Sequence, residues 1–397
     1  MSFKGKHDTI SAVKKMNFQE ELCAWYKIHH RELPFRQSRD PYAIWVSEIM
    51  AQQTRIDSML PYYKRWMERW PTVEALAEAP IEDILHVWQG LGYYNRARKL
   101  HAGAKVVVER YGGLLPADVE QLRTIPGIGF YTAGAIGSIA YGLRAPAVDG
   151  NVLRVTTRVL QYGEDITKKT TADYVWRQVY DWMEGSNPAV FTQAMMEIGA
   201  LVCTPKNPQC LLCPLAPFCG AGQDGSWSQY PVKKKAKPPL ELQLYTYWIE
   251  NDRRQILLSD DWSDGLMEGL YRLPQAAAPL EQTDQLDFAG QRKHVFSHRV
   301  WKMECYRGQW DDQVQETLPE HCFWIAKDQL DTLPIVGAHR KWLDEGLADD
   351  AEASPDNPES VQISEASLTD PAETAGIEAC QVSDASIMEK KKNKKKG

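Results

Sequence analysis

The spacing of apolar residues changes once along this 397-residue chain, and that change limits the fold to two unlike parts. From residue 17 to about 220, apolar residues recur every three or four positions, as on one face of a helix. Beyond residue 241 they alternate, as strands do, before a helical run at 327–346. The sequence therefore predicts a multidomain protein, all-α in its first part and α+β in its second.

Proline and glycine lie between the expected elements, as helix boundaries require. The expected helices cover residues 17–30, 41–58, 60–69, 81–88, 94–110, 118–124, 131–141, 151–162, 171–184 and 189–201. The expected strands cover residues 242–249, 255–259, 265–274, 294–308 and 321–326.

Composition sets the domain boundaries. Residues 222–240 are rich in polar, lysine and proline residues, which predicts a linker between domains at 1–221 and 241–348. The tail, 349–397, is acidic and ends in a lysine run, so we expect it to be disordered. Because the net charge of −7 belongs largely to this tail, it does not argue against a polyanionic partner.

We expect neither a membrane span nor a secretion signal. No apolar run approaches the roughly 18 residues of a membrane span, and the start is too polar for a secretion signal. We expect a cytoplasmic monomer of bacterial type, associated with the nucleoid and not with a membrane.

Four of the eight cysteines lie in one short loop, residues 203–219, with the spacing C-x6-C-x2-C-x5-C. A disulfide knot does not suit a reducing cytosol, and structural zinc usually uses two separated C-x2-C knuckles. One compact loop of this kind favours an iron–sulfur cluster, with zinc as the alternative. The expected ligands are Cys203, Cys210, Cys213 and Cys219.

A glycine-rich stretch, 126-PGIGFYTAG-134, lies between two expected helices. Glycines this close free backbone N–H groups to face an anion such as a phosphate. The stretch is no nucleotide-binding loop of the Walker type. Such a loop ends in Gly-Lys-Ser/Thr, whereas Gly129 is followed by phenylalanine and tyrosine. A plain packing corner between helices is the alternative.

Two carboxylates are candidates for acid–base chemistry. Glu48 lies on the face of a helix that it shares with Ile44 and Gln52, and an apolar surrounding would raise its pKa. Asp149 precedes the helical run that begins at Asn151. A solvated helix acid and a helix N-cap are the respective alternatives. A protonated and a charged carboxyl group together are the usual means of breaking a glycosidic bond.

The cysteine loop, the motif L-x-x-I-P-G-I-G and the sequence V-D-G-N together resemble the helix-hairpin-helix DNA glycosylases related to endonuclease III. The resemblance covers residues 17 to about 346, and it implies a [4Fe-4S] cluster on the four cysteines. It also implies that Gly127 and Gly129 grip a DNA phosphate through their N–H groups. The sequence 46-VSEIMAQQT-54 resembles the adenine-specific branch, which acts on double-stranded DNA with A:8-oxoguanine or A:G mispairs.

The resemblance assigns roles to individual residues. Glu48 would protonate adenine at N7 and Asp149 would stabilise the cation-like sugar, with its neighbour Asn151 counted among the catalytic residues. Tyr131 stands where bifunctional relatives have a nucleophilic lysine, which implies a monofunctional glycosylase. Gln53 and Tyr93 would enter the base stack when adenine leaves it.

Further residues would recognise the two bases of the mispair. Arg36 and Gln193 align with positions that read the adenine edge, although each of the base-contacting candidates has a purely structural alternative. Phe296, Ser297 and His298 resemble the F-S-H loop of a Nudix-like domain that meets 8-oxoguanine. The Nudix catalytic core R-E-x-x-E-E is missing from the sequence, so we expect no pyrophosphate hydrolysis.

Two other functions stay open at this point. An endonuclease III-like enzyme for oxidised pyrimidines is the alternative within the same class, and Tyr131 and the F-S-H loop argue against it. A non-catalytic DNA-binding protein with a zinc knuckle is the alternative from another class.

Overall fold

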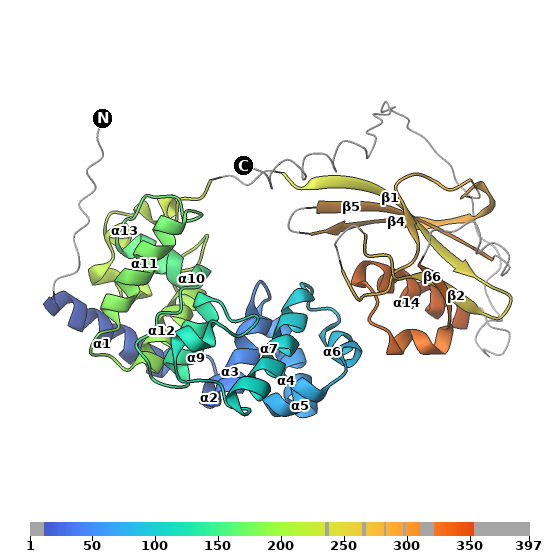
Figure 1. Cartoon of the computed structure of the whole chain (residues 1–397). Coiled ribbons are helices and arrows are strands. Elements are labelled where there is room, and N and C mark those ends of the chain that lie inside the picture. Colours follow the sequence, from blue (N-terminus) through green and yellow to red (C-terminus); the bar gives the residue numbers. More distant parts are fainter. Residues whose placement is uncertain are drawn as a thin grey trace, which may run out of the picture. The chain divides into compact units, whose positions relative to one another are not determined.

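The computed structural model describes residues 12–234, 238–263, 267–281, 283–296, 299–309 and 321–352 (Figure 1). As expected, the elements of the first part are all helical within its described residues. The α-helices are α1 (Ala12–His29), α2 (Pro34–Gln37), α3 (Pro41–Ala51), α4 (Ile56–Arg69), α5 (Val73–Glu78), α6 (Ile81–Trp88), α7 (Asn95–Tyr111), α8 (Val119–Leu122), α9 (Phe130–Ile139), α10 (Gly150–Val159), α11 (Lys169–Trp182), α12 (Pro188–Leu201) and α13 (Gly220–Gln223). The 3₁₀ helices are η1 (Cys210–Leu212), η2 (Ala216–Phe218) and η3 (Ser226–Gln229).

The helix expected over 41–58 is interrupted. Helix α3 ends at Ala51, and a turn follows in which Gln53 has a φ of 55°. Helix α4 then begins at Ile56, within the range expected for the preceding helix, and contains Pro61. The left-handed backbone at Gln53 is what ends α3, since a right-handed helix cannot pass through it.

Close helix contacts bring three segments together around α9. Helix α9 packs against both α3 and α12. A Cβ atom on Gly134 would lie 2.1 Å from the carbonyl oxygen of Pro146, so only glycine permits this approach of α9 to the segment before Asp149. The charge of Asp149, at the beginning of α10, acts on Glu48 of α3, so these two segments lie near each other.

The expected linker is only partly a linker. Helices α13 and η3 lie within residues 220–229, and the N–H of Ile166 donates to the carbonyl of Val232 at 2.9 Å. The buried Arg158 donates to the carbonyls of Trp227 and Tyr230, each at 3.1 Å. Residues 222–232 are thus bound to the helical part, because their carbonyls satisfy the donors of Arg158 and Ile166.

The second part of the chain is a mixed sheet with a helix, as expected. Its elements are β1 (Leu240–Glu250), β2 (Gln255–Ser259), β3 (Gln275–Ala276), η4 (Thr283–Gln285), β4 (Asp287–Val295), β5 (Arg299–Gln309), β6 (Cys322–Ala326), η6 (Lys327–Thr332) and α14 (Gly337–Glu352). The strand order is β4-β5-β1-β2-β6, with β3 beside β1. Strands β1 and β5 are parallel, with Leu240 opposite Arg299, and the other pairs are antiparallel.

Several expectations for this part are wrong in detail. In the described part of 265–274, only isolated bridges form, at Tyr271 and Arg272. The helical run expected over 327–346 divides into η6 and α14 because Pro334 lies between them. Helix α14 also continues past residue 348, where the sequence analysis ends the domain; residues 353–397 of the expected disordered tail lie outside the described residues.

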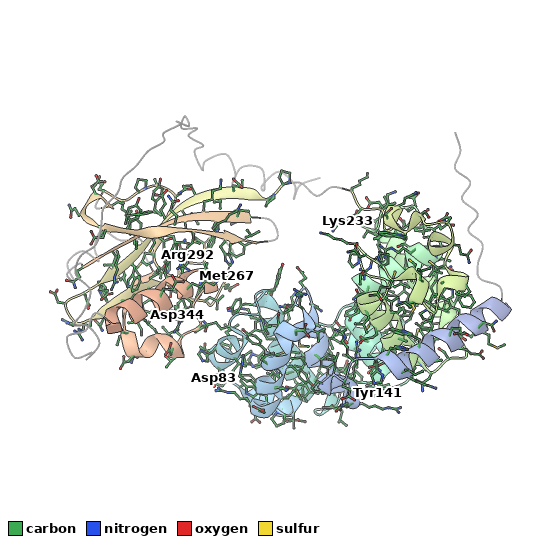
Figure 2. The ribbon with its side chains drawn as sticks, turned by 180° about the vertical axis from the view of Figure 1, so that it is seen from behind. Asp83, Tyr141, Lys233, Met267, Arg292 and Asp344 are labelled. Atoms are coloured by element: carbon green, nitrogen blue, oxygen red, sulfur yellow. The ribbon has the colours of Figure 1, made fainter. Side chains whose placement is uncertain are left out.

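The core of the second part forms around the inner strands, where Tyr247, Ile249 and Leu257 are fully buried. From α14, the buried His339 accepts a hydrogen bond at Nδ1 from the N–H of Leu273 at 2.9 Å. Burial lowers the pKa of His339 to about 3, so the ring is neutral and structural. Figure 2 labels Arg292 on β4 and Asp344 on α14.

No helix among the described residues has the length and apolar character to span a bilayer.

Candidate active site

Helix α3 carries Glu48 into an apolar interior. Asp40 caps the helix by accepting from the N–H groups of Tyr42 and Ala43, at 3.0 and 3.3 Å, and Pro41 occupies its first position. All residues from Tyr42 to Met50 are buried, and Glu48 is 9% exposed. Burial raises the pKa of Glu48 to about 7, and the charge of Asp149 adds to the increase. At neutral pH the carboxyl group of Glu48 can therefore carry a proton.

Tyr131, in the first turn of α9, contacts this carboxyl group directly. Its hydroxyl donates a hydrogen bond to Oε2 of Glu48. Burial, together with the negative charge of Glu48, raises the pKa of Tyr131 well above its ordinary value, so the phenol keeps its proton. Because Oε2 accepts from the phenol, Oε1 is the oxygen of Glu48 that is left to carry an acidic proton. This hydrogen bond was not anticipated from the sequence.

Asp149 is the N-cap of α10, which is the structural alternative considered for it. Its Oδ1 accepts from the N–H of Val152 and its Oδ2 from Nδ2 of Asn151, both at 2.7 Å. Burial raises the pKa of Asp149, while these hydrogen bonds oppose the increase by favouring the charged form. Of the two carboxyl groups, Asp149 is the better held as an anion.

A hydrogen-bonded chain joins Asp149 to the cysteine loop. Arg154 donates from Nη2 to Oδ1 of Asn151 and from Nε to the carbonyl of Cys203, both at 2.8 Å. A Cβ atom on Gly199 of α12 would lie 2.6 Å from Cβ of Asn151, so α12 and α10 are in close contact here. The orientation of Asp149 therefore depends on α10 and on the loop that begins at Cys203.

Arg36 is held by a residue that the sequence analysis missed. Glu197 of α12 is fully buried and accepts from Nη1 of Arg36. Arg31 also donates to Glu197, from Nε at 2.8 Å and from Nη2 at 3.0 Å. Burial raises the pKa of Glu197, but the hydrogen bonds from Arg31 and the charge of Arg36 outweigh it, and the net pKa is lowered. A lone acid in the apolar run of α12 was the available signal.

Gln193 lies one turn before Glu197 and is also buried. Its Oε1 accepts from the hydroxyl of Tyr26 at 3.2 Å, and its Nε2 donates to the carbonyl of Ala189 at 3.1 Å. The charge of Arg36 lowers the pKa of both Glu48 and Tyr131, which places all three in one electrostatic environment.

The glycine-rich turn lines one pocket together with Tyr93, one of the two expected stack-filling residues. Gly127 has a φ of 85°, and it lines the pocket together with Gly129, Tyr93 and Tyr131. Gln53 and Tyr93 are both exposed, and Tyr93 has a φ of 52°. Lys99 and Arg123 line the same pocket, so the surroundings of the glycines are basic.

Of the expected F-S-H loop, the structure describes only Phe296. Its N–H donates to the carbonyl of Arg299 at 2.8 Å, and its ring contacts His294 and Trp301, with centroids 4.6 and 4.8 Å away. Ser297 and His298 lie outside the described residues.

The four cysteines of the loop line one pocket, together with Arg158 and Trp227. Within the described ranges, no group of three or more His, Cys, Asp or Glu side chains is arranged to hold a single metal ion. Arg158 donates from Nη1 to Sγ of Cys203 at 3.2 Å, and the N–H of Gly222 donates to Sγ of Cys219 at 3.3 Å. Such donors to sulfur suit thiolates that ligate a metal cluster.

Two of these thiols are disfavoured as thiolates without a bound cation. Burial raises the pKa of Cys213 to about 12 and that of Cys219 to about 11, and repulsion among the neighbouring cysteines adds to both increases. Four thiolates in one buried pocket need compensating positive charge, and iron would supply it.

Known proteins are similar to both parts of the chain. Residues 46–179 match the HhH-GPD superfamily of base excision DNA repair proteins, and residues 245–345 match the NUDIX domain. A human protein named adenine DNA glycosylase is 33% identical over 82% of this chain and 73% of its own length. A rat protein of that name is 35% identical, over 82% of this chain and 77% of the relative. The solved structure of a thermostable thymine-DNA glycosylase has a TM-score of 0.48 at 25% identity, covering 53% of this chain and 97% of that one.

Proposed function

Since the chain belongs to the adenine DNA glycosylases of the HhH-GPD superfamily, we propose that it removes adenine paired with 8-oxoguanine or guanine from duplex DNA. Excision of adenine in DNA repair comes with the family, whereas the base opposite and the roles of single residues are proposed. Family membership excludes both alternatives named above, the enzyme for oxidised pyrimidines and the non-catalytic DNA-binding protein. The observation that carries the proposal is the buried Glu48, with a pKa of about 7, between Tyr131 and Asp149.

Glu48 supplies the proton. Adenine leaves poorly as an anion, and protonation at N7 lets it leave as a neutral base. Oε1 of Glu48 delivers this proton, because Oε2 is engaged by the hydroxyl of Tyr131. The same hydrogen bond then stabilises the carboxylate that remains.

Asp149 faces the opposite charge. As the base departs, the sugar becomes cation-like, and a fixed anion nearby lowers the energy of that state. Three donors orient the carboxylate: the N–H of Val152, the side chain of Asn151 and the N–H of Asn151. Asn151 thus has a positioning role, which Arg154 supports.

Tyr131 makes the enzyme monofunctional. Lyase chemistry needs an amine that forms a Schiff base with the sugar, and a phenol whose pKa is raised cannot provide one. Arg36 and Gln193 contact the adenine edge, while Gln53 and Tyr93 fill the stack after extrusion. Gly127 and Gly129 bind a backbone phosphate of the DNA.

The four cysteines, Cys203, Cys210, Cys213 and Cys219, hold a [4Fe-4S] cluster. Bound there, the cluster supplies structural cross-linking and electron transfer, not hydrolysis. Arg158 contributes by donating to one ligand sulfur. The loop of Phe296, Ser297 and His298 contacts 8-oxoguanine, and the protein acts as a cytoplasmic monomer near the nucleoid.

The test is an incubation of the protein with a duplex that holds adenine opposite 8-oxoguanine, followed by alkali to cleave the abasic site. Glu48→Gln keeps the shape of the side chain but has no acidic proton, so excision should fall by about a thousandfold or more. The matched control is Glu68→Gln, which changes an exposed residue of α4 and should leave the rate unchanged.

Two outcomes would contradict the proposal. Full activity of Glu48→Gln would remove the acid from the mechanism. Strand cleavage without alkali, accompanied by borohydride trapping of the protein on its DNA, would show a lyase in place of a monofunctional enzyme.

A further inference from the structure

Two loops on opposite sides of Arg96 carry the residues proposed to fill the base stack. Gln53 lies in the turn between α3 and α4, and Tyr93 lies in the turn between α6 and α7. The two turns are 40 residues apart in the sequence, and each contains a non-glycine residue with positive φ, 55° at Gln53 and 52° at Tyr93. Such a backbone is strained for an L-residue, and it persists only where neighbouring groups fix it.

The guanidinium of Arg96 is the group that joins the turns. Toward the first, Nη1 donates to the carbonyl of Ile49 at 2.9 Å, to that of Met50 at 3.1 Å and to that of Gln52. Nη2 donates to Oγ1 of Thr54 at 3.3 Å.

Toward the second turn, Nη2 of Arg96 donates to the carbonyls of Leu91 and Gly92, at 3.2 and 3.0 Å. The guanidinium also lies over two rings of this segment, with its central carbon 5.2 Å from the centroid of Trp88 and 5.5 Å from that of Tyr93. In the first turn, Arg96 therefore binds the residues before and after Gln53, which are Gln52 and Thr54. In the second turn it binds Gly92, the residue before Tyr93.

Arg96 makes these contacts without a carboxylate partner among the interactions seen for its side chain. Burial lowers the pKa of Arg96 to about 10, which reflects the cost of removing this cation from water. The buried cation is tolerated because its N–H groups satisfy carbonyls that would otherwise lack hydrogen-bond donors. A lysine has a compact ammonium with three donors, and it cannot reach both turns with the planar geometry of a guanidinium.

We propose that Arg96 is a positioning residue that locks the two stack-filling turns into one preformed wedge, so that adenine extrusion, and not the chemical step, depends on it. This inference rests on the proposed function. The wedge enters the duplex when the base leaves. If its turns had to become ordered only then, the lost conformational entropy would make extrusion less favourable. The guanidinium binds carbonyls next to Glu48 on α3, but none of the hydrogen bonds described joins it to the side chains of Glu48, Asp149 or Tyr131, so we expect extrusion to change more than the chemical step.

The experiment compares Arg96→Lys and Arg96→Gln with wild-type protein on two duplexes in single-turnover excision. One duplex holds adenine opposite 8-oxoguanine, and the other holds the same adenine in a bubble of unpaired bases, where no wedge is needed. We expect both variants to lose about tenfold or more on the paired duplex and less than about threefold on the bubble. Arg110→Gln, which removes an exposed charge from the same helix, is the matched control and should keep both rates.

The ratio of the two rates is the deciding quantity, because a partly unfolded preparation lowers both rates equally and leaves the ratio unchanged. A second readout places 2-aminopurine at the target position with saturating enzyme, and its emission on unstacking should be lower with both variants. Equal losses on the two duplexes, or a wild-type ratio with Arg96→Lys, would overturn the inference. Absence of wild-type excision from both duplexes would instead contradict the proposed function.

Discussion

At the scale of single residues, the proposed chemistry needs one protonated and one charged carboxyl group. Burial raises the pKa of Glu48 to about 7, whereas at Asp149 hydrogen bonds from Asn151 and Val152 oppose the increase that burial causes. The charge of Arg36 limits the increase in the pKa of Glu48, and Arg36 is itself fixed by Glu197. The pKa of Glu48 therefore depends indirectly on Glu197, a residue of α12 that has no hydrogen bond to either carboxyl group.

Excision should depend on pH through Glu48. Its folded pKa is raised from 4.5 to about 7, so the protonated form is present below that pH and is lost above it. The single-turnover rate should be highest on the acidic side and fall about tenfold for each pH unit well above 7. Measuring the rate between pH 5.5 and 9 checks this, and a flat profile to pH 9 would show that another group donates the proton.

Glu197 should be needed both for stability and for the tuning of Glu48. Glu197→Gln leaves Arg36 and Arg31 without their anion, and breaking a buried pair on one side costs about 3 kcal/mol, less here because Arg31 is partly exposed. We expect a lower melting temperature and a lowered pKa in the rate profile, since the charge of Arg36, which lowers the pKa of Glu48, is no longer offset by Glu197. Glu184→Gln is the control: it breaks an exposed pair with Lys15 and should change neither measurement.

At the scale of helices and strands, much could be predicted from the sequence because periodicity reports burial. Helix α6 begins and ends where expected, at Ile81 and Trp88. The break after Ala51 could not be predicted, because it depends on the carbonyls that Arg96 binds from another helix. Glu197 was missed for a related reason: its partners, Arg31 and Arg36, lie more than 160 residues away in the sequence.

Some candidate residues were identified by pattern although their contacts were not. Glu48 stood out as an acid on an apolar helix, but its bond to Tyr131 requires α3 and α9 to be in contact. Asp149 was expected either to cap a helix or to take part in catalysis, and the structure shows that it caps α10. The catalytic assignment of both residues stays a prediction.

Gly134 should be essential for the contact between α9 and the segment before Asp149. In Gly134→Ala the new Cβ would meet the backbone oxygen of Pro146, which cannot rotate away as a side chain could. We expect a loss of about 2–4 kcal/mol in the free energy of unfolding, typical of severe overpacking. Gly150→Ala is the control, because its new Cβ atom would meet open space. Gly142→Ala is a poorer control, because the positive φ of Gly142 would strain an alanine. Urea unfolding measures the difference, and an unchanged midpoint for Gly134→Ala would contradict this packing.

At the scale of the whole molecule, the boundary between the two parts matters for the cysteine loop. The loop is covered by residues that follow it, since Trp227 lines the pocket of the four cysteines. Arg158 contacts Sγ of Cys203 with Nη1 and the carbonyls of Trp227 and Tyr230 with Nε. Residues 222–232 therefore belong energetically to the helical part, although their composition is that of a linker.

Two truncated chains test whether residues 222–232 belong to the helical part or form a linker. A chain of residues 1–234 keeps Trp227, Tyr230 and Val232, so it should fold, retain iron and excise adenine, with a reduced preference for 8-oxoguanine over guanine opposite the base. A chain of residues 1–221 lacks these partners and leaves the donors of the buried Arg158 unsatisfied, which costs about 1–3 kcal/mol for each lost bond. We expect it to lose iron and to melt at a lower temperature.

Absorbance near 400 nm, iron content and thermal unfolding compare the two truncations directly. The matched variant is Arg158→Lys in the full chain: it keeps the charge near Cys203 but cannot donate to both sides of the pocket, so it should resemble the shorter truncation. Equal iron content in both truncations would show that residues 222–232 are a linker after all, with no part in holding the cysteine loop.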